Sequence, residues 1–196
     1  MNLPNKLTVS RIILTFVFMG FLYTHGILAK TLALVTFLFA SLTDALDGYI
    51  AKKNNQITDF GRLMDPIADK ILVLAALLAF VERGLVPAWM VVIIIFREVV
   101  VTGLRVLALT KGEVLPADRV GKHKTVWQLS AITAILLFLI FREGGAAKFK
   151  FWNAGTEVLY KNAIFVIMLV VVALTLTSGI AYFVKNKEVY SNAKAD

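Results

Sequence analysis

The segment from Asp44 to Asp69 carries aspartates at spacings that would bring them together on helices. Asp44 and Asp47 are three residues apart, while Asp65 and Asp69 are four apart. Residues three or four apart lie on one face of a helix, so each pair would present two carboxylates together. Carboxylate oxygens suit Mg²⁺, Mn²⁺ or Ca²⁺ far better than zinc or copper. The spacing therefore predicts a site for hard divalent cations.

The same aspartates could instead cap helices or pair with nearby cations, namely Lys52, Arg62 and Lys70. Apolar sequence flanks the segment on both sides. Because a carboxylate near the hydrocarbon layer is costly and usually functional, we favour the cation site. Two ions sharing a carboxylate form a template for displacement at phosphorus. Asp69 could be a general base toward an alcohol, a ligand only, or a partner of Lys70, and the sequence leaves this open.

Two glycines accompany the aspartates: Gly48 follows Asp47 directly, and Gly61 lies one helical turn before Asp65. Without a Cβ atom, each glycine would let a flat group or a phosphate lie against the helix backbone. Glycines in membrane helices also serve close helix packing. Their placement among four aspartates favours contact with a ligand.

The composition is that of a membrane protein. The 196 residues are 59% hydrophobic and 17% charged, whereas soluble domains average about half apolar and a quarter charged. The length fits a single domain covering residues 1–196. Cysteine is absent, which excludes disulfides and thiolate metal sites. The net charge of +8 indicates anionic lipid headgroups and phosphorylated substrates rather than nucleic acid, because the basic residues flank apolar segments.

The hydropathy pattern predicts an all-α membrane protein with six transmembrane helices. Asn162–Val184 is uncharged and long enough to span a bilayer, and Thr125–Phe141 nearly so. The others reach span length when their charged residues face the protein interior. These four stretches are Ile12–Tyr23, which can run on to Ala29, Thr31–Ile50, Arg62–Phe80 and Val86–Thr110.

Two further segments are expected to lie at the membrane interface. Met1–Arg11 intersperses apolar and polar residues after a helix-start signal at Pro4, which predicts a short amphipathic helix. Ala147–Tyr160 places aromatic residues among lysines and predicts a second one. Lysine and arginine favour the side of the N-terminus, so both termini are expected in the cytoplasm. Asp44–Asp69 would then lie at the cytoplasmic ends of the second and third spans.

The aspartate segment resembles the signature of the CDP-alcohol phosphotransferase family, D-x2-D-G-x2-A-R-x8-G-x3-D-x3-D. Lys52 stands where the family has arginine, and lysine keeps the charge but loses the bidentate fork. The other specified positions all match, at Asp44, Asp47, Gly48, Ala51, Gly61, Asp65 and Asp69.

Four more stretches resemble the phosphatidylglycerophosphate synthase branch of that family. They are NLPNKLTVSR at 2–11, FREVVVTGLR at 96–105, GKHKT at 121–125 and SGIAYF at 178–183. The resemblance implies that CDP-diacylglycerol and glycerol 3-phosphate give phosphatidylglycerophosphate and CMP. It also implies six transmembrane helices, an N-terminal amphipathic helix, a homodimer and a place in the bacterial cytoplasmic membrane.

The resemblance also implies roles for single residues. Asp44, Asp47 and Asp65 would ligate one Mg²⁺ or Mn²⁺, while Asp44, Asp65 and Asp69 would reach a second. Asp69 would in addition deprotonate the attacking hydroxyl. The residues expected to approach CDP-diacylglycerol are Asn5, Thr8, Gly48, Lys52 and Gly61.

Basic residues in the fourth and fifth spans suit an acceptor that carries a phosphate. Arg97 and Arg105 are eight residues apart, roughly 80° around a helix, so both can face one cavity. Glu98, as the adjacent residue, is expected to be a poor partner for Arg97. Lys122 and Lys124 lie at the start of the fifth span, where lysines also extend to lipid headgroups.

Two rival functions use the same residues. A sister enzyme would carry the same signature with another acceptor, such as inositol phosphate, and the basic residues argue against serine or choline. A cation transporter would use the aspartates as an ion pathway, but transport gives no reason for Gly48, Gly61 or a basic cavity.

Overall fold

A computed structural model describes residues 3–54, 59–110, 119–144 and 152–187. Side chains are described throughout these ranges except at 3–8, 44–54, 59–69, 109–110 and 119–123. Within these ranges the chain forms six helices and no strand. The helices are α1 (Leu3–Tyr23), α2 (Ile27–Asn54), α3 (Asp59–Glu82), α4 (Ala88–Thr110), α5 (Arg119–Gly144) and α6 (Ala154–Lys185). The predicted all-α class is confirmed.

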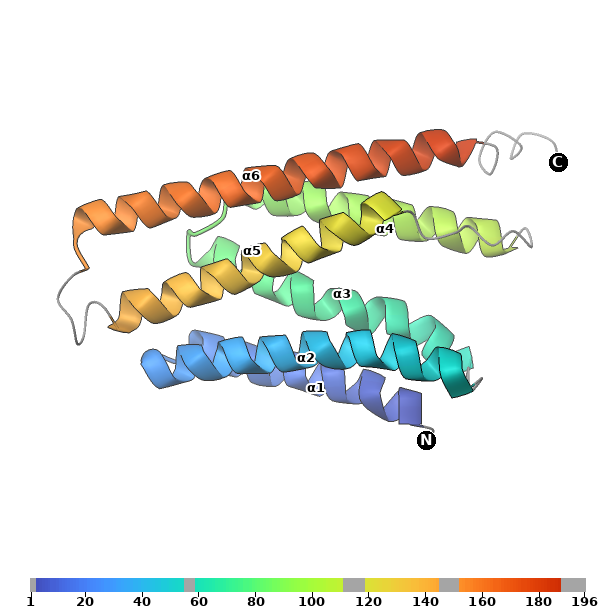
Figure 1. Cartoon of the computed structure of the whole chain (residues 1–196), viewed down its shortest axis with the longest axis horizontal. Coiled ribbons are helices and arrows are strands. Elements are labelled where there is room, and N and C mark those ends of the chain that lie inside the picture. The colour runs from blue at the N-terminus through green and yellow to red at the C-terminus, as the bar shows by residue number, and fades with distance from the viewer. Residues whose placement is uncertain (1–2, 55–58, 111–118, 145–151, 188–196) are drawn as a thin grey trace.

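The helices form an elongated bundle in which successive helices run in opposite directions (Figure 1). The beginning of α1 and the end of α6 therefore lie at the same end of the bundle. The end of α2, the start of α3, the end of α4 and the start of α5 share that end as well. We call it the N-terminal end and call the other the opposite end. Helices distant in sequence pack side by side, including α1 with α3 and α2 with α5.

Glycines with positive φ turn the chain at the opposite end. Gly26 has φ 105° and separates α1 from α2, so the expected run of the first span to Ala29 is wrong. Gly84 has φ 66°, and its N–H donates to the carbonyl of Val81 while Leu85 N–H donates to that of Phe80. These two hydrogen bonds end α3 in a geometry that favours glycine at position 84, since only glycine adopts positive φ without strain.

The predicted interfacial segments differ from the structure. Leu3–Arg11 forms one continuous helix with the first span in α1, with no break before Ile12. Ala154–Tyr160 forms the first turns of α6, and 147–151 lies outside the described residues. Asn153 caps α6: its side chain accepts from Thr156 N–H at 2.9 Å, and its own N–H donates to Thr156 Oγ1 at 2.9 Å. This cap starts α6 earlier than the apolar run alone would suggest.

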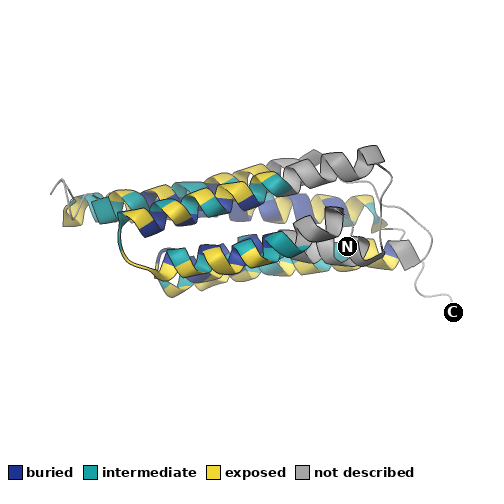
Figure 2. Cartoon of the chain, turned by 90° about the horizontal axis from the view of Figure 1, so that it is seen from below, coloured by how far each residue is buried: buried dark blue, intermediate teal, exposed yellow. Residues whose placement is uncertain are grey.

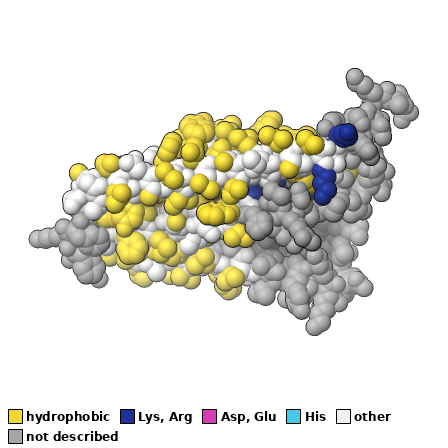
Figure 3. Space-filling model, turned by 45° about the horizontal axis from the view of Figure 1, so that its top comes forward, with side chains coloured by type: hydrophobic (Ala, Val, Ile, Leu, Met, Phe, Trp, Pro, Cys, Tyr) yellow, Lys and Arg dark blue, Asp and Glu magenta, His cyan; other side chains and the backbone are white. Residues whose placement is uncertain are grey.

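The bundle buries apolar side chains inside and exposes others outside. Phe18, Phe37 and Phe80 are fully buried at the core, whereas Phe16 and Leu28 are 71% and 73% exposed. Buried and exposed positions alternate along the helices (Figure 2). On the face shown in Figure 3, apolar side chains cover much of the described surface and basic ones gather near one end. Exposed apolar surface of this extent is typical of helices that face lipid.

Two helical stretches of the described chain are long and apolar enough to cross a membrane, Lys124–Gly144 and Ala154–Lys185. They contain the predicted spans Thr125–Phe141 and Asn162–Val184. Val9–Tyr23 and Ile27–Thr43 are shorter apolar helical stretches. The composition and these helices indicate a membrane protein.

Candidate functional site

The aspartates of the signature lie on two helices that meet at the N-terminal end. The backbones of Asp44 and Asp47 belong to the second half of α2, and those of Asp65 and Asp69 to the first half of α3. Both helices are continuous through these positions, so the backbones of each pair lie about one helical turn apart. The side chains lie outside the described residues, so the metal-ligand assignment stays a prediction.

Several other predicted contacts also fall on side chains outside the described residues. Asn5 and Thr8 belong to α1, Gly48 and Lys52 to α2, Gly61 to α3, and Lys122 to α5. Their backbones are helical and lie toward the N-terminal end. These contacts therefore stay predictions.

The described part of the site is a group of cations around one carboxylate, that of Glu98 on α4. Lys124 of α5 forms an ion pair with Glu98 Oε1, although its residue is only 3% exposed. Lys70 Nζ of α3 lies 3.8 Å from Glu98 Oε2, and Arg97 Nη1 lies 3.4 Å from Oε1. We call Lys70, Arg97, Glu98 and Lys124 the Glu98 cluster. It joins three helices through one acidic side chain.

The threonine one turn after Glu98 fixes the position of Lys70. Thr102 Oγ1 donates to the Glu98 carbonyl oxygen at 2.7 Å and accepts a hydrogen bond from Lys70 Nζ. Lys70 Nζ also lies 3.4 Å from the same carbonyl oxygen. The lysine is therefore bound to the backbone and to a side chain of α4, which ties α3 to α4 next to the aspartate segment.

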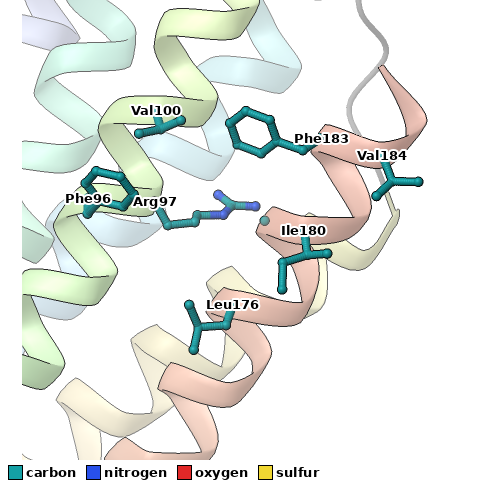
Figure 4. Close-up of a pocket in the computed structure, with 8 residues that line it drawn as sticks. Phe96, Arg97, Val100, Leu176, Ile180, Phe183 and Val184 are labelled. Atoms are coloured by element: carbon teal, nitrogen blue, oxygen red, sulfur yellow. The ribbon is translucent and has the colours of Figure 1, made fainter. Parts of the chain in front are cut away.

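Arg97 extends from α4 toward α6 (Figure 4). Its Nη2 donates to Ser178 Oγ at 3.1 Å. A Cβ atom at position 179 would lie 3.1 Å from Arg97 Cγ, so Gly179 leaves room for the arginine between the two helices. A groove of about 330 Å³ opens there, and Arg97 is the charged residue among its apolar lining.

Arg105 also turns toward α6. Its guanidinium carbon lies 6.0 Å from the centre of the Tyr182 ring, at the outer limit of a cation–π contact. Arg97 and Arg105 therefore both contact α6. They differ in burial, since the Arg97 side chain is 13% exposed while Arg105 is exposed to solvent or lipid.

One expectation about this group is wrong. Glu98 does contact Arg97, because the long arginine side chain can bend back toward its neighbour, although adjacent side chains leave a helix in different directions. The stronger partner of Glu98 is Lys124, from another helix. Sequence reasoning also missed Lys70, Glu98 and Ser178 as members of the site. A charged glutamate inside an apolar helix was the signal that could have identified Glu98.

Three buried polar atoms near this site have no hydrogen-bond partner within the described chain. They are Arg97 Nε, Thr175 Oγ1 and the Tyr182 hydroxyl. Buried polar groups are normally paired, so the α4–α6 contact offers donors and acceptors to a bound polar group. Together with the Glu98 cluster, this arrangement suits an anionic ligand.

Known proteins resemble this chain over two thirds or more of its length. The profile of the CDP-alcohol phosphatidyltransferase family matches residues 1–186. The chain is 40% identical to the CDP-diacylglycerol–glycerol-3-phosphate 3-phosphatidyltransferase of Bacillus subtilis (strain 168), covering 95% of this chain and 96% of the relative. It is 36% identical to the protein of that name in Rickettsia typhi, over 93% and 95% of the two chains. A probable phosphatidylglycerophosphate synthase of Mycobacterium tuberculosis is 39% identical over 69% of this chain and 66% of its own.

Proposed function

The chain belongs to the CDP-alcohol phosphatidyltransferase family, and we propose that it transfers the phosphatidyl group of CDP-diacylglycerol to glycerol 3-phosphate. The products are phosphatidylglycerophosphate and CMP, in the synthesis of anionic phospholipid. The observation that carries this proposal is the 40% identity, over nearly both full lengths, to a relative named for this reaction. The Glu98 cluster supports it, since it offers cations to an acceptor that carries a phosphate.

The acceptor phosphate binds at the N-terminal end, between α3, α4, α5 and α6. Arg97 and Lys124 contact it directly, and Arg105 and Lys122 add positive charge beside them. Charge-assisted hydrogen bonds to phosphate are about twice as strong as neutral ones. Holding the phosphate at a fixed point orients the far hydroxyl of glycerol 3-phosphate for attack.

The reaction needs no covalent intermediate on the protein. Asp69 accepts the proton of the primary hydroxyl as general base. The hydroxyl oxygen then forms a bond to the phosphorus that bears the diacylglycerol. The bond from that phosphorus to the CMP oxygen breaks, and CMP leaves with the electron pair. Asn5, Thr8, Gly48, Lys52 and Gly61 hold the CDP-diacylglycerol in line with the acceptor.

The donor set fits two Mg²⁺ or Mn²⁺ ions. The aspartate pairs lie on unbroken helices and offer only carboxylate oxygens, the ligand type that these ions prefer. Asp44, Asp47, Asp65 and Asp69 would hold the ions. When bound, such ions neutralise charge on the pyrophosphate and on the departing CMP.

We further propose six transmembrane spans, a homodimer, and a location in the bacterial cytoplasmic membrane with the site facing the cytoplasm. The alternating helix directions support this topology, because they bring the aspartate segment to the same end as the start of α1 and the end of α6. The exposed apolar side chains of α1, α2 and α4 support spans beyond the two longest stretches.

Purified protein, CDP-diacylglycerol and a panel of acceptors test the proposal. The panel holds glycerol 3-phosphate, inositol phosphate, serine and glycerol, and the readouts are CMP release and the mass of the lipid product. We expect phosphatidylglycerophosphate from glycerol 3-phosphate, loss of turnover in EDTA, and recovery on adding Mg²⁺ or Mn²⁺. A faster reaction with inositol phosphate would assign the chain to the sister activity.

A further inference from the structure

We propose that Glu98 is a positioning residue for the acceptor phosphate: it holds the cations of its cluster together and gives them up to the phosphate when the acceptor binds. This inference rests on the proposed function for the identity of the anion. It assigns a role to an acidic side chain in a site that must bind a negatively charged substrate, where an acid would otherwise weaken binding.

The described side chains of the cluster carry more positive than negative charge. Lys70, Arg97 and Lys124 supply three positive charges against the single negative charge of Glu98. A phosphate monoester carries about −1.5 to −2 charges near neutral pH. The excess of positive charge among these described side chains favours an anion of this kind.

The contacts also show how the exchange can occur. Lys124 and Arg97 share one carboxylate oxygen, Oε1, and Lys70 approaches the other. A single carboxylate thus draws together side chains from α3, α4 and α5 that would otherwise repel one another. A phosphate presents three terminal oxygens, so it can accept bonds from the same cations without their moving apart.

Space for an anion exists beside the carboxylate. A cavity of about 110 Å³ is lined by Lys70, Glu98, Lys124, Thr125 and Gln128, with two apolar residues completing its wall. This is several times the roughly 30 Å³ that one water occupies in the liquid. The Lys124 residue is 3% exposed and Gln128 is 5% exposed, so these two side chains are withdrawn from bulk solvent, whereas Lys70 and Glu98 are partly exposed.

Glu98→Gln tests the role, because it removes the charge and keeps the shape. Without the competing carboxylate, inorganic phosphate should bind about tenfold more tightly, the lower bound for one charge-assisted contact. Turnover of glycerol 3-phosphate should instead fall by about tenfold, because the cations no longer converge on one point. A residue with only a structural role would weaken both phosphate binding and turnover.

The measurement is isothermal titration of inorganic phosphate into the purified full-length protein, alongside CMP release from the same preparation. Glu157→Gln is the matched control, since Glu157 also contacts two cations, Arg142 and Lys161, but near the opposite end of the bundle. It should change neither quantity. Glu98→Asp, which keeps the charge on a shorter side chain, should bind phosphate with an affinity between those of wild type and Glu98→Gln.

Phosphate binding that is unchanged or weaker in Glu98→Gln overturns the inference. Should that variant not fold, Glu98→Asp decides: phosphate binding no tighter than in the wild type contradicts the role. The titration is independent of turnover. A wild type that binds phosphate yet makes no phosphatidylglycerophosphate would overturn the proposed function and not the role of Glu98 toward an anion.

Discussion

Lys124 and Lys30 are both buried cations, and their partners differ. In the Glu98 cluster, Lys124 is paired with an acidic side chain that it shares with Lys70 and Arg97. At the opposite end, Lys30 is 1% exposed, and its Nζ donates to the backbone carbonyls of Leu22 at 2.7 Å and Thr24 at 2.6 Å.

A second cation, Arg83, contacts the end of α1 at the opposite end of the bundle. Arg83 also donates to the Leu22 carbonyl, and its guanidinium carbon lies 5.5 Å from the centre of the Tyr23 ring. The Tyr23 hydroxyl donates to Glu82. The last carbonyl groups of a helix have no hydrogen-bond partner within that helix. Lys30 and Arg83 donate hydrogen bonds to carbonyl groups at the end of α1.

We interpret this difference as one between a cation that stabilises the fold and a cation that binds substrate. Lys30 is bound by main-chain oxygens that no substrate can replace, so it belongs to the fold. Lys124 is bound by one carboxylate that three cations share, so a phosphate can take the place of that carboxylate. Burial alone does not distinguish the two lysines, and the chemical nature of their acceptors does.

The largest effect is expected from Asp65→Asn at the N-terminal end. The substitution removes a carboxylate proposed to reach both divalent ions, so CMP release should be lost at every acceptor concentration. The melting temperature should stay close to that of the wild type. Turnover near the wild-type level would contradict the two-metal arrangement.

Lys124→Met is expected to impair acceptor binding. Loss of one charge-assisted contact to phosphate is worth roughly 1.5–3 kcal/mol, or about 10- to 150-fold. The KM for glycerol 3-phosphate should rise by that factor, and the KM for CDP-diacylglycerol should change much less. Steady-state kinetics with each substrate varied in turn measures both.

Lys30→Met is the matched substitution at the opposite end, and it should act on stability. It removes the donor to the Thr24 carbonyl and one of the two donors to the Leu22 carbonyl, which Arg83 still bonds, at a cost of about 1.5–3 kcal/mol for a hydrogen bond to a charged group. Thermal unfolding in detergent should show a lower melting temperature, with an unchanged KM for glycerol 3-phosphate. A raised KM without destabilisation would remove the distinction between the two lysines.

Arg105→Ala should raise the KM for glycerol 3-phosphate, by about tenfold at the low end of a charge-assisted contact. The effect is expected to be smaller than that of Lys124→Met because Arg105 is exposed and solvent weakens its charge. An effect confined to CDP-diacylglycerol would place Arg105 in the other substrate's pocket.

The smallest effect is expected from Gly179→Ala. The new Cβ would lie 3.1 Å from Arg97 Cγ and should displace that side chain by a few tenths of an ångström. We expect a KM for glycerol 3-phosphate raised a few-fold. Gly103→Ala on α4 is the control, because its Cβ would meet nothing within 4 Å. It should leave the kinetics unchanged, and equal effects of the two variants would argue against positioning of Arg97.

The sequence predicted the helices better than their ends. Apolar stretches and charge placement identified all six regions that are helical in the described chain. The break at Gly26 was missed because His25 and Gly26 interrupt an apolar run only briefly, and the positive φ that turns the chain is a backbone property. The continuity of α1 through Arg11 was missed because an interfacial helix and a span have the same local pattern.

In the candidate site, too, features that follow from a single helix could be predicted, and contacts between helices could not. The spacing of Arg97 and Arg105 predicted from helix geometry that both can face one cavity; both contact α6, and a shared cavity stays a prediction. The Glu98 cluster could not be predicted, because Lys70, Glu98 and Lys124 come from three helices. Only the packing of α3, α4 and α5 brings them together. For the aspartate side chains, the metal assignment remains a prediction from spacing and resemblance.

The central claim is that the cations of the Glu98 cluster bind the phosphate of the acceptor. It is tested most directly by comparing kcat/KM of the wild-type protein for glycerol 3-phosphate and for glycerol, with CDP-diacylglycerol as donor. Two charge-assisted contacts at roughly 1.5–3 kcal/mol each predict a preference of at least about 100-fold for glycerol 3-phosphate. Equal values for the two acceptors would contradict the claim.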